Sequence, residues 1–410
     1  MSQELAPIVV QKYGGSSVAD PERLRKVAVR VAETVRRGYR VVVVVSAMGR
    51  TTDQLLELAR SVSASPPRRE LDMLLSAGER ISAALLAIAI SDQGCDAVSF
   101  TGSQCGIITS HRHTDARILE VRPYRVQDEL DRGRVVIIAG FQGVSYKRDI
   151  TTLGRGGSDT TAVAMAAALG AEYCEICSDV DGVYTADPRV VPSPRHLSTI
   201  SYAEMQELAL HGAKVLNAQA VEFARKQGIV IFARASSGSE RQTRVAATSP
   251  ERGGGAVGVA GLSQLLCVRG AGGAEQLSQL GEVLRSFQLA PLWAHLHEGR
   301  PVLFLHGSQC VDSPGLVAAL EKTGPIELES GLEAASVVGE GLGDDPGHLA
   351  ALLELARELE LPVHSVDTAP LRLTLVLRPG HLARAQQALH ARFVEQEHAP
   401  SVDVVGETQP

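Results

Sequence analysis

The chain has 410 residues, of which 44% are hydrophobic, 21% charged and 4% aromatic, and its formal net charge is −7. This length exceeds what one hydrophobic core supports and predicts two or three domains, with cores of valine, leucine, alanine and isoleucine. The negative charge excludes a general attraction to nucleic acid or to an anionic membrane, so a small-molecule function is favoured. No basic leader precedes the first apolar run, and the apolar runs are short for a bilayer, which predicts a cytoplasmic protein. Six cysteines over this length do not indicate a disulfide framework.

Up to about residue 235, short apolar runs alternate with helical patterns. Continuous apolar strands separated by helices predict a mostly parallel sheet covered on both faces. Ligands of such sheets bind beyond the carboxyl ends of the strands. Four glycine- or hydroxyl-rich loops follow strands directly, so we expect them to converge on one edge of the sheet. The expected strands are 8–14, 41–47, 97–102, 135–141 and 174–180, and the loops are KYGGSS, SAMGRTTD, GFQG and SDVDG.

The most informative loop is LGRGGSDTTA at 153–162, a glycine-rich turn that runs into an alanine-rich helix. Backbone NH groups at a helix N-terminus beside the guanidinium of Arg155 make a site for a carboxylate or a phosphate. An alternative stays open, because any glycine turn capped by Ser158 or Asp159 would begin a helix in the same way.

Two earlier loops also carry candidate residues. Lys12 precedes Gly14 and Gly15, which offers a charge for phosphate and a backbone that approaches closely, although the loop does not fit the Walker pattern. Thr51 or Thr52 is either a helix cap or a ligand contact. Glu79 interrupts an otherwise apolar helix, and its spacing does not decide between a solvated acid and a partner for a ligand amine.

The segment SDVDGVYTADPR at 178–189 contains an aromatic residue, two acids and an arginine that turn chemistry alone does not explain, and this set suits a nucleotide. Lys214 is expected on a partly buried helical stretch, in contact with an anion. His111 and His113 form an HxH pair that no further ligand completes, so a solvated loop is favoured over a metal site. The pair Cys174 and Cys177 indicates a buried strand rather than a redox motif.

After a predicted linker at 248–258 the chain looks duplicated. Two βαββαβ units at a spacing of about seventy residues fit a pair of ferredoxin-like modules. These modules carry no concentrated set of nucleophiles or acids, so we expect them to bind, dimerise or regulate. The first has strands 265–270, 292–296 and 301–306 with helices 274–287 and 314–322. The second has strands 335–341, 363–368 and 371–377 with helices 346–359 and 381–393, and residues 402–406 are expected to close its sheet.

Six segments, in order along the chain, resemble the aspartate kinases of the amino acid kinase superfamily, and the tail resembles the paired ACT domains of such kinases. The segments are 12–17, 46–53, 76–80, 154–161, 178–189 and 212–216. The resemblance implies a three-layer α/β amino acid kinase fold, with a mostly parallel sheet sandwiched by helices, followed by two ferredoxin-like βαββαβ ACT domains. The implied domains are 1–245, 246–331 and 332–410.

The resemblance also implies a reaction and its site. The enzyme would transfer the γ-phosphoryl group of ATP, with Mg²⁺, to the side-chain carboxylate of L-aspartate, the first step toward lysine, threonine, methionine and diaminopimelate. A homodimer through the ACT domains is implied as well. The implied catalytic residues are Lys12, Asp179 and Lys214. The implied ATP-binding residues are Lys12, Tyr13, Gly14, Gly15, Ser46, Ser178, Asp179, Tyr184, Asp187, Arg189 and Lys214. Aspartate would be held by Thr52, Glu79, Arg155, Gly156, Gly157 and Ser158, with Glu79 on its ammonium and Arg155 on its α-carboxylate, and no side chain is assigned to a metal.

The chain departs from the family pattern at two places. Asn217, Ala218 and Gln219 follow Lys214-Val215-Leu216 where many relatives read HPR, which predicts retained but reduced activity. The first ACT unit has GAGGAEQ at 270–276 in place of an Asp-x-Pro-Gly turn, and APLWAHL at 290–296 in place of an INID-type strand. We therefore expect weak or absent feedback inhibition by lysine plus threonine. A kinase acting on glutamate, N-acetylglutamate or UMP is disfavoured, and the remaining alternative is a catalytically weakened kinase-like amino-acid sensor or regulatory subunit.

Overall fold

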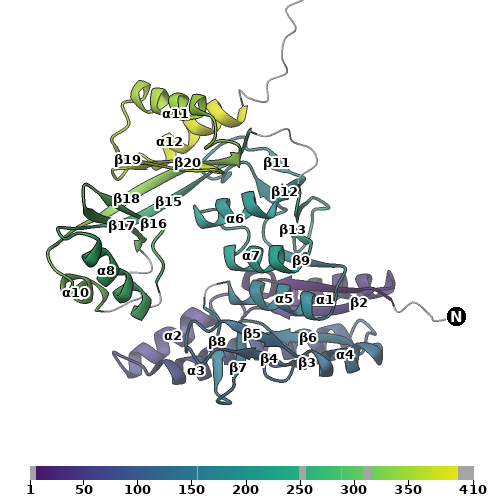
Figure 1. Cartoon of the computed structure of the whole chain (residues 1–410). Coiled ribbons are helices and arrows are strands. Elements are labelled where there is room, and N and C mark those ends of the chain that lie inside the picture. Colours follow the sequence, from purple (N-terminus) through teal and green to yellow (C-terminus); the bar gives the residue numbers. More distant parts are fainter. Residues whose placement is uncertain (1–5, 155, 249–254, 288, 308–314, 396–410) are drawn as a thin grey trace, which may run out of the picture. The chain divides into compact units, whose positions relative to one another are not determined.

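The computed structural model describes residues 6–154, 156–248, 255–287, 289–307 and 315–395. They form two compact units, coloured along the sequence in Figure 1. The N-terminal unit contains the described residues up to Tyr184, together with His196–Ala209 and those from Lys214 to residue 248. The C-terminal unit contains Thr185–Arg195, Leu210–Ala213 and the described residues from 255 onward. Two short segments of the first 245 residues therefore cluster with the C-terminal unit.

The N-terminal unit is built on an eight-stranded sheet in the order β12-β14-β13-β9-β1-β2-β6-β3. Every neighbouring pair is parallel except β13 and β14. The apolar runs of β1, β2, β6 and β9 are buried almost throughout, as expected for strands covered on both faces, whereas the edge strand β3 is buried only at Phe100. The strands are β1 (Ile8–Tyr13), β2 (Arg40–Val45), β3 (Ala97–Phe100), β6 (Val135–Ala139), β9 (Tyr173–Ser178), β12 (Thr199–Ser201), β13 (Ile231–Ala235) and β14 (Gln242–Ala246).

Helices cover both faces of this sheet, which confirms the predicted three layers. On one face, Leu24 of α1 and Leu86 of α3 pack against Tyr13 and Ile137 in one apolar core. On the other face α5 lies against β1, β2 and β9, and α7 packs against α5. Asp20 caps α1, since its Oδ1 accepts from the amide of Arg23. The helices are η1 (Gly15–Val18), α1 (Pro21–Arg36), α2 (Thr51–Val62), α3 (Arg68–Ser91), α4 (Tyr124–Asp131), α5 (Gly157–Ala168), α6 (Tyr202–Leu210) and α7 (Ala218–Gln227).

A smaller four-stranded sheet in the order β5-β4-β7-β8 also contacts α3, through β8. Among the described residues, α3 is the one helix whose length and composition match a membrane span. It is nevertheless a core helix, because Leu86 and Ile90 are fully buried in the protein and the helix also buries Asp72 and Glu79. The remaining strands of the unit are β4 (Ile107–Thr109), β5 (Ile118–Val121), β7 (Gln142–Ser145), β8 (Ile150–Thr152), β10 (Val183–Tyr184) and β11 (His196–Leu197).

The C-terminal unit is a single six-stranded antiparallel sheet in the order β16-β17-β15-β18-β20-β19. Its elements confirm the predicted strands and helices of two βαββαβ modules. They are β15 (Gly255–Gly270), α8 (Ala274–Phe287), β16 (Trp293–His297), β17 (Arg300–His306), α10 (Leu316–Glu321), β18 (Ile326–Glu340), α11 (Pro346–Glu358), β19 (Val363–Ala369), β20 (Arg372–Leu377), α12 (Leu382–Leu389) and η2 (His390–Glu395).

The two modules share strands instead of following one another along the chain. The long strands β15 and β18 pair over their whole length, and each serves both modules. The first half of β15 lies beside the second half of β18, in the place that we expected residues 402–406 to take; those residues lie outside the described part. Gly255 and Gly258, expected in the linker, already belong to β15. Register shifts near Leu262 on β15 and a positive φ of 82° at Gly331 on β18 mark the junction between the modules.

Candidate active site

The strand ends of the N-terminal unit meet at one edge of the sheet, as the loop positions predict. Tyr13 is paired with Val45 and with Cys177, and Val45 is paired with Ala139. Backbone hydrogen bonds continue this pairing into the loops: Ser46 N to Tyr13 O at 3.1 Å, Gly14 N to Cys177 O at 3.3 Å, Gly49 N to Gly15 O at 3.0 Å and Gly140 N to Val45 O at 3.0 Å. Four loops distant in sequence therefore form one continuous surface.

Lys12 points to the α5 face of the sheet and forms an ion pair with Asp159. The distance from Lys12 Nζ to Asp159 Oδ1 is 2.6 Å, and each side chain is only 12% exposed. The ammonium group also lies beside the loop of Gly14 and Gly15, since a Cβ placed on Gly14 would be 3.5 Å from it. Asp159 is a site residue that our sequence reasoning considered only as a helix cap. Its position directly after the GGS turn was the available signal.

The neighbouring residues of this loop have different environments. Gly15 is required by close approach, because a Cβ there would lie 2.7 Å from the carbonyl oxygen of Ala47. Tyr13, predicted to bind ATP, has its side chain fully buried in the core, where its hydroxyl group donates to Gln11 Oε1 at 3.3 Å. Only the backbone of Tyr13 is therefore placed to meet a ligand.

The second loop positions two threonines at the start of α2. The helix begins at Thr51 with Arg50 in the cap position, so the expected cap function of Thr51 or Thr52 is wrong. Thr51 Oγ1 instead donates to the carbonyl oxygen of Met48 at 2.6 Å. Thr52 is half-buried on the first turn of α2.

Glu79, which the sequence left undecided, is a buried acid. Its side chain lies on α3, the residue is 3% exposed, and Oε1 accepts a hydrogen bond from the amide of Ala47 at 3.2 Å. Within the described part of the chain, Oε2 has no hydrogen-bond partner. Burial raises the pKa of this carboxyl group from 4.5 to about 7. A carboxylate in this setting is poised to accept a cationic hydrogen-bond donor.

The glycine loop leads into α5 without a side-chain cap. Gly156 occupies the cap position with a φ of 72°, and neither Ser158 nor Asp159 caps the helix, so that alternative is wrong. Ser158 is buried beside Gly140, where an added Cβ would lie 2.8 Å from its hydroxyl oxygen. Gly157 begins the helix and is buried. Arg155 lies outside the described residues.

Asn217, the first residue of the departure from the family pattern, has two structural roles. Its Oδ1 caps α7 by accepting from the amides of Gln219 and Ala220, at 3.0 and 3.1 Å. Its amide group also packs against the glycine loop, since a Cβ on Gly156 would lie 2.1 Å from Asn217 Nδ2. Asn217 therefore both caps α7 and contacts the glycine turn at Gly156.

Lys214 differs from the prediction. It is exposed and lies in the loop between α6 and α7, not on a partly buried helix. The helical pattern is interrupted because Gly212 has a φ of 117° and α7 begins only after the Asn217 cap. Its contact with an anion stays a prediction, and it stands three residues before the side chain that meets Gly156.

The segment expected to bind nucleotide is divided between the two units. Ser178 ends β9, Asp179 is exposed beyond it, and the hydroxyl group of Tyr184 donates to Asp181 Oδ1 at 2.7 Å. Asp187 and Arg189 belong to the stretch that clusters with the C-terminal unit, and they form an ion pair at 2.7 Å. A cavity of about 340 Å³ opens beside the first group, and it is lined by Ser16, Ser17, Arg23, Lys26, Val27, Ser178, Asp179, Ala235, Ser236 and Ser237.

Two other sequence predictions are resolved by burial. Cys174 and Cys177 are fully buried in β9, which confirms packing, and burial raises the pKa of both thiols. His111 is exposed as expected for a solvated loop. His113 is not solvated: its side chain is 19% exposed, and its Nδ1 lies 2.6 Å from Asp72 Oδ2. The HxH spacing gave no sign of this acidic partner, which lies 41 residues earlier in the chain.

Comparisons with known proteins agree with this geometry. Residues 7–233 match the amino acid kinase family. The chain is 44% identical to the aspartokinase of Mycolicibacterium smegmatis, covering 94% of this chain and 96% of that protein, and 42% identical to that of Corynebacterium glutamicum, with the same coverage. It shares its fold with E. coli aspartokinase III in complex with aspartate and ADP, with a TM-score of 0.84, 23% identity, and coverage of 94% and 99% of the two chains. The chain is therefore a phosphotransferase that belongs to the aspartokinases of the amino acid kinase family.

Proposed function

We propose that the enzyme transfers the γ-phosphoryl group of MgATP to the side-chain carboxylate of L-aspartate, releasing ADP and 4-phospho-L-aspartate. The observation that carries this assignment is Glu79, a buried carboxylate with one oxygen unpaired among the described residues, at the edge where the loops converge. A group of this kind matches the ammonium of an amino acid. The product, 4-phospho-L-aspartate, would be the first intermediate on the pathways to lysine, threonine, methionine and diaminopimelate.

The chemistry requires positioning more than acid–base catalysis. The aspartate carboxylate is already an anionic nucleophile, so no general base is needed, and the barrier comes from bringing two anions into line. Lys12 supplies positive charge beside the loop of Gly14 and Gly15, and its pairing with Asp159 holds Nζ in place. As charge spreads over the γ-phosphoryl oxygens in the transition state, a fixed ammonium group lowers the energy of that state. Lys214 and Asp179 are proposed to complete the phosphate end of the site.

The substrate end uses the groups around α3 and α5. We assign the aspartate ammonium to Glu79 and its carboxylates to the loop of Arg155, Gly156, Gly157 and Ser158, with Thr52 beside them. The dipole of α5 favours an anion at its N-terminus, where the amides of Gly157 and Asp159 donate to the carbonyl oxygens of Gly154 and Gly156 at 3.1 and 3.0 Å. Opposite charges at the two ends of the pocket orient the amino acid.

The nucleotide end is assigned to Gly14, Gly15, Ser46, Ser178 and Tyr184, together with the backbone of Tyr13. The close approach at Gly15 fits a backbone that wraps a phosphate group. Magnesium bound to the nucleotide would supply charge screening at the phosphate oxygens. The one acid beside Lys12, Asp159, is occupied by its ion pair, so we assign no side chain to the metal.

We further propose that the two C-terminal modules are ACT domains that hold a cytoplasmic homodimer together. Their shared strands β15 and β18 give one rigid sheet with helices α8, α10, α11 and α12 packed on it. Because 270–276 and 290–296 depart from the family pattern, we expect little inhibition by lysine plus threonine.

Formation of aspartyl hydroxamate from L-aspartate and MgATP tests the reaction. Wild-type enzyme should give hydroxamate with aspartate and not with glutamate or N-acetylglutamate, and Lys12→Met should give at most about a hundredth of the wild-type rate. Absence of hydroxamate from a folded wild-type enzyme that still binds aspartate would refute the kinase assignment and favour an amino-acid sensor.

A further inference from the structure

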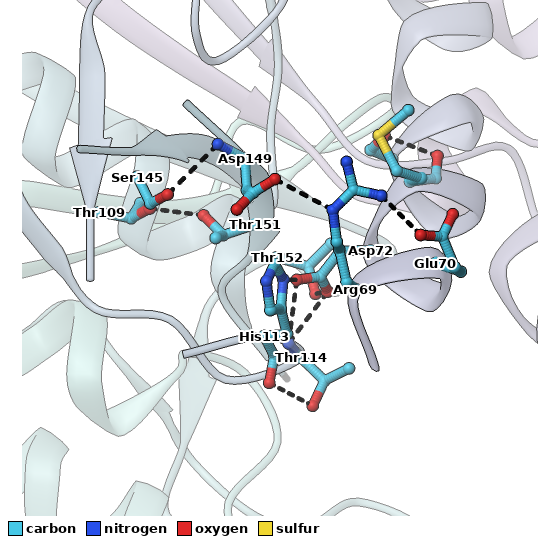
Figure 2. Close-up of polar contacts among 12 residues, drawn as sticks. Arg69, Glu70, Asp72, Thr109, His113, Thr114, Ser145, Asp149, Thr151 and Thr152 are labelled. Carbon is cyan, nitrogen blue, oxygen red and sulfur yellow. Dashed lines mark hydrogen bonds and ion pairs between the residues drawn. The ribbon is translucent and has the colours of Figure 1, made fainter. Parts of the chain in front are cut away.

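A buried carboxylate outside the residues assigned to the reaction lies two helical turns before Glu79. Asp72 is on α3 and its side chain is fully buried. Figure 2 shows it at the centre of a set of polar contacts from two separate segments. Thr152 Oγ1 donates to Oδ1 at 2.6 Å, His113 Nδ1 donates to Oδ2 at 2.6 Å, and the amide of Thr114 donates to both oxygens at 3.0 and 3.2 Å.

Burying a carboxylate is costly unless hydrogen bonds compensate, so this position is not explained by packing alone. Burial raises the pKa of Asp72, while the contacts with Thr152, His113 and Thr114 oppose that shift. These donors come from two places: Thr152 from the end of β8, and His113 and Thr114 from the β4–β5 loop. Asp72 therefore joins both of them to α3.

Both segments that Asp72 joins to α3 lie next to the glycine turn that begins at Leu153. Thr152 is the last residue of β8, directly before Leu153 and Gly154. Leu153 then donates its amide to the carbonyl oxygen of Phe141 at 2.9 Å. Fixing Thr152 thus fixes the start of the turn in which we place the aspartate carboxylates.

The β4–β5 loop also packs closely against the start of the same turn. Thr114 has a φ of 68°, an uncommon conformation for a residue with a side chain, and its amide is held by Asp72. The next residue, Asp115, approaches Gly154 so closely that a Cβ placed there would lie 3.0 Å from Asp115 Oδ1. His113 and Asp72 therefore set the position of the loop that borders Gly154.

We propose that Asp72 is a positioning residue: with His113 it fixes Leu153 and Gly154, the start of the glycine turn, relative to α3, and so sets the distance between Glu79 and the turn that holds the substrate carboxylates. This inference rests on the proposed function of Glu79 and the glycine loop. Aspartate must contact Glu79 and the glycine turn at the same time. A displacement of that turn by about 1 Å therefore weakens both the binding of aspartate and its alignment for phosphoryl transfer.

The test compares Asp72→Asn with the matched control Asp149→Asn. Asp149 also ties α3 to the smaller sheet, through Arg69 Nε at 3.0 Å (Figure 2), but its side chain forms this ion pair within the described residues without a hydrogen bond to the glycine turn or to Thr114. We expect Asp72→Asn to raise KM for aspartate about tenfold or more and to leave KM for ATP within about twofold. Asp149→Asn should leave both constants near the wild-type values.

A milder pair keeps the proposal testable if Asp72→Asn fails to fold. Thr152→Val removes only the hydroxyl group that bonds to Asp72, and Thr152→Ser keeps it. We expect Thr152→Val to raise KM for aspartate and Thr152→Ser to retain wild-type behaviour. Equal effects of the two variants would overturn the role of this hydrogen bond.

Amide hydrogen exchange over residues 153–158 gives a readout that does not depend on the reaction. Exchange there should be faster in Asp72→Asn or Thr152→Val than in the wild type and unchanged in Asp149→Asn. Unchanged exchange in the first two variants would refute the positioning role even if the enzyme phosphorylates aspartate. Faster exchange in an enzyme that does not phosphorylate aspartate would refute the proposed function and leave the positioning role standing.

Discussion

Glu79→Gln should stabilise the protein at alkaline pH while it weakens aspartate binding. In the folded state burial raises the pKa of Glu79 from 4.5 to about 7, so ionising it within the fold costs about 3 kcal/mol. The unfolded chain releases this proton near pH 4.5, and stability is therefore highest below that pH and falls as the pH rises to about 7. Glutamine has the same shape and no charge, so it removes this loss.

Urea unfolding followed by far-UV circular dichroism measures the effect. We expect the variant to exceed the wild type by about 1 kcal/mol at pH 5 and by about 3 kcal/mol at pH 8. Glu70→Gln, an exposed position on the same helix, serves as the control and should show no such growth with pH. A stability difference that is the same at both pH values would refute the reasoning, because the effect would then not come from ionisation.

The same carboxyl group predicts the pH dependence of substrate binding. If ionised Glu79 accepts the ammonium of aspartate, KM for aspartate in the wild type should be about tenfold higher at pH 6 than at pH 8. In Glu79→Gln this dependence should disappear and KM should be high throughout. A wild-type KM that is flat between pH 6 and 8 would contradict the assignment of Glu79 to the ammonium.

Further predictions concern the lysine, the glycine turn and regulation. Lys12→Met should lower kcat/KM for ATP by about 10²–10³-fold in a coupled ADP assay, and a change below threefold would exclude Lys12 from phosphate binding. Gly156→Ala should raise KM for aspartate, because alanine at a φ of 72° costs about 1–2 kcal/mol and its Cβ would meet Asn217 Nδ2 at 2.1 Å. In the double variant with Asn217→Gly every side-chain atom of residue 217 that meets the added Cβ is removed and only the backbone strain stays, so KM should recover in part; no recovery would show that the contact is unimportant. Lysine plus threonine at millimolar concentration should change the rate of the purified enzyme by less than about twofold, whereas ordinary concerted inhibition would contradict our interpretation of segment 270–276.

The sequence determined the local elements of this protein and the edge where its chemistry lies. Runs such as the five valines of β2 are apolar on both faces, which is possible only for a strand covered on both sides, and parallel strands bring their carboxyl ends to one edge. The glycine turn at 153–162 and Lys12 were found in this way. The βαββαβ order of the tail followed from the same periodicities.

Only the tertiary structure decided which side chains are buried and paired. The burial of Glu79, the pair between Lys12 and Asp159, and the contacts of Asp72 with His113 and Thr152 each join segments that are far apart in the chain. The exposed position of Lys214 and the strands shared by the two C-terminal modules were likewise not visible in local patterns. A periodic pattern reports which face of an element is apolar, whereas desolvation and hydrogen bonding depend on distant segments that the pattern does not contain.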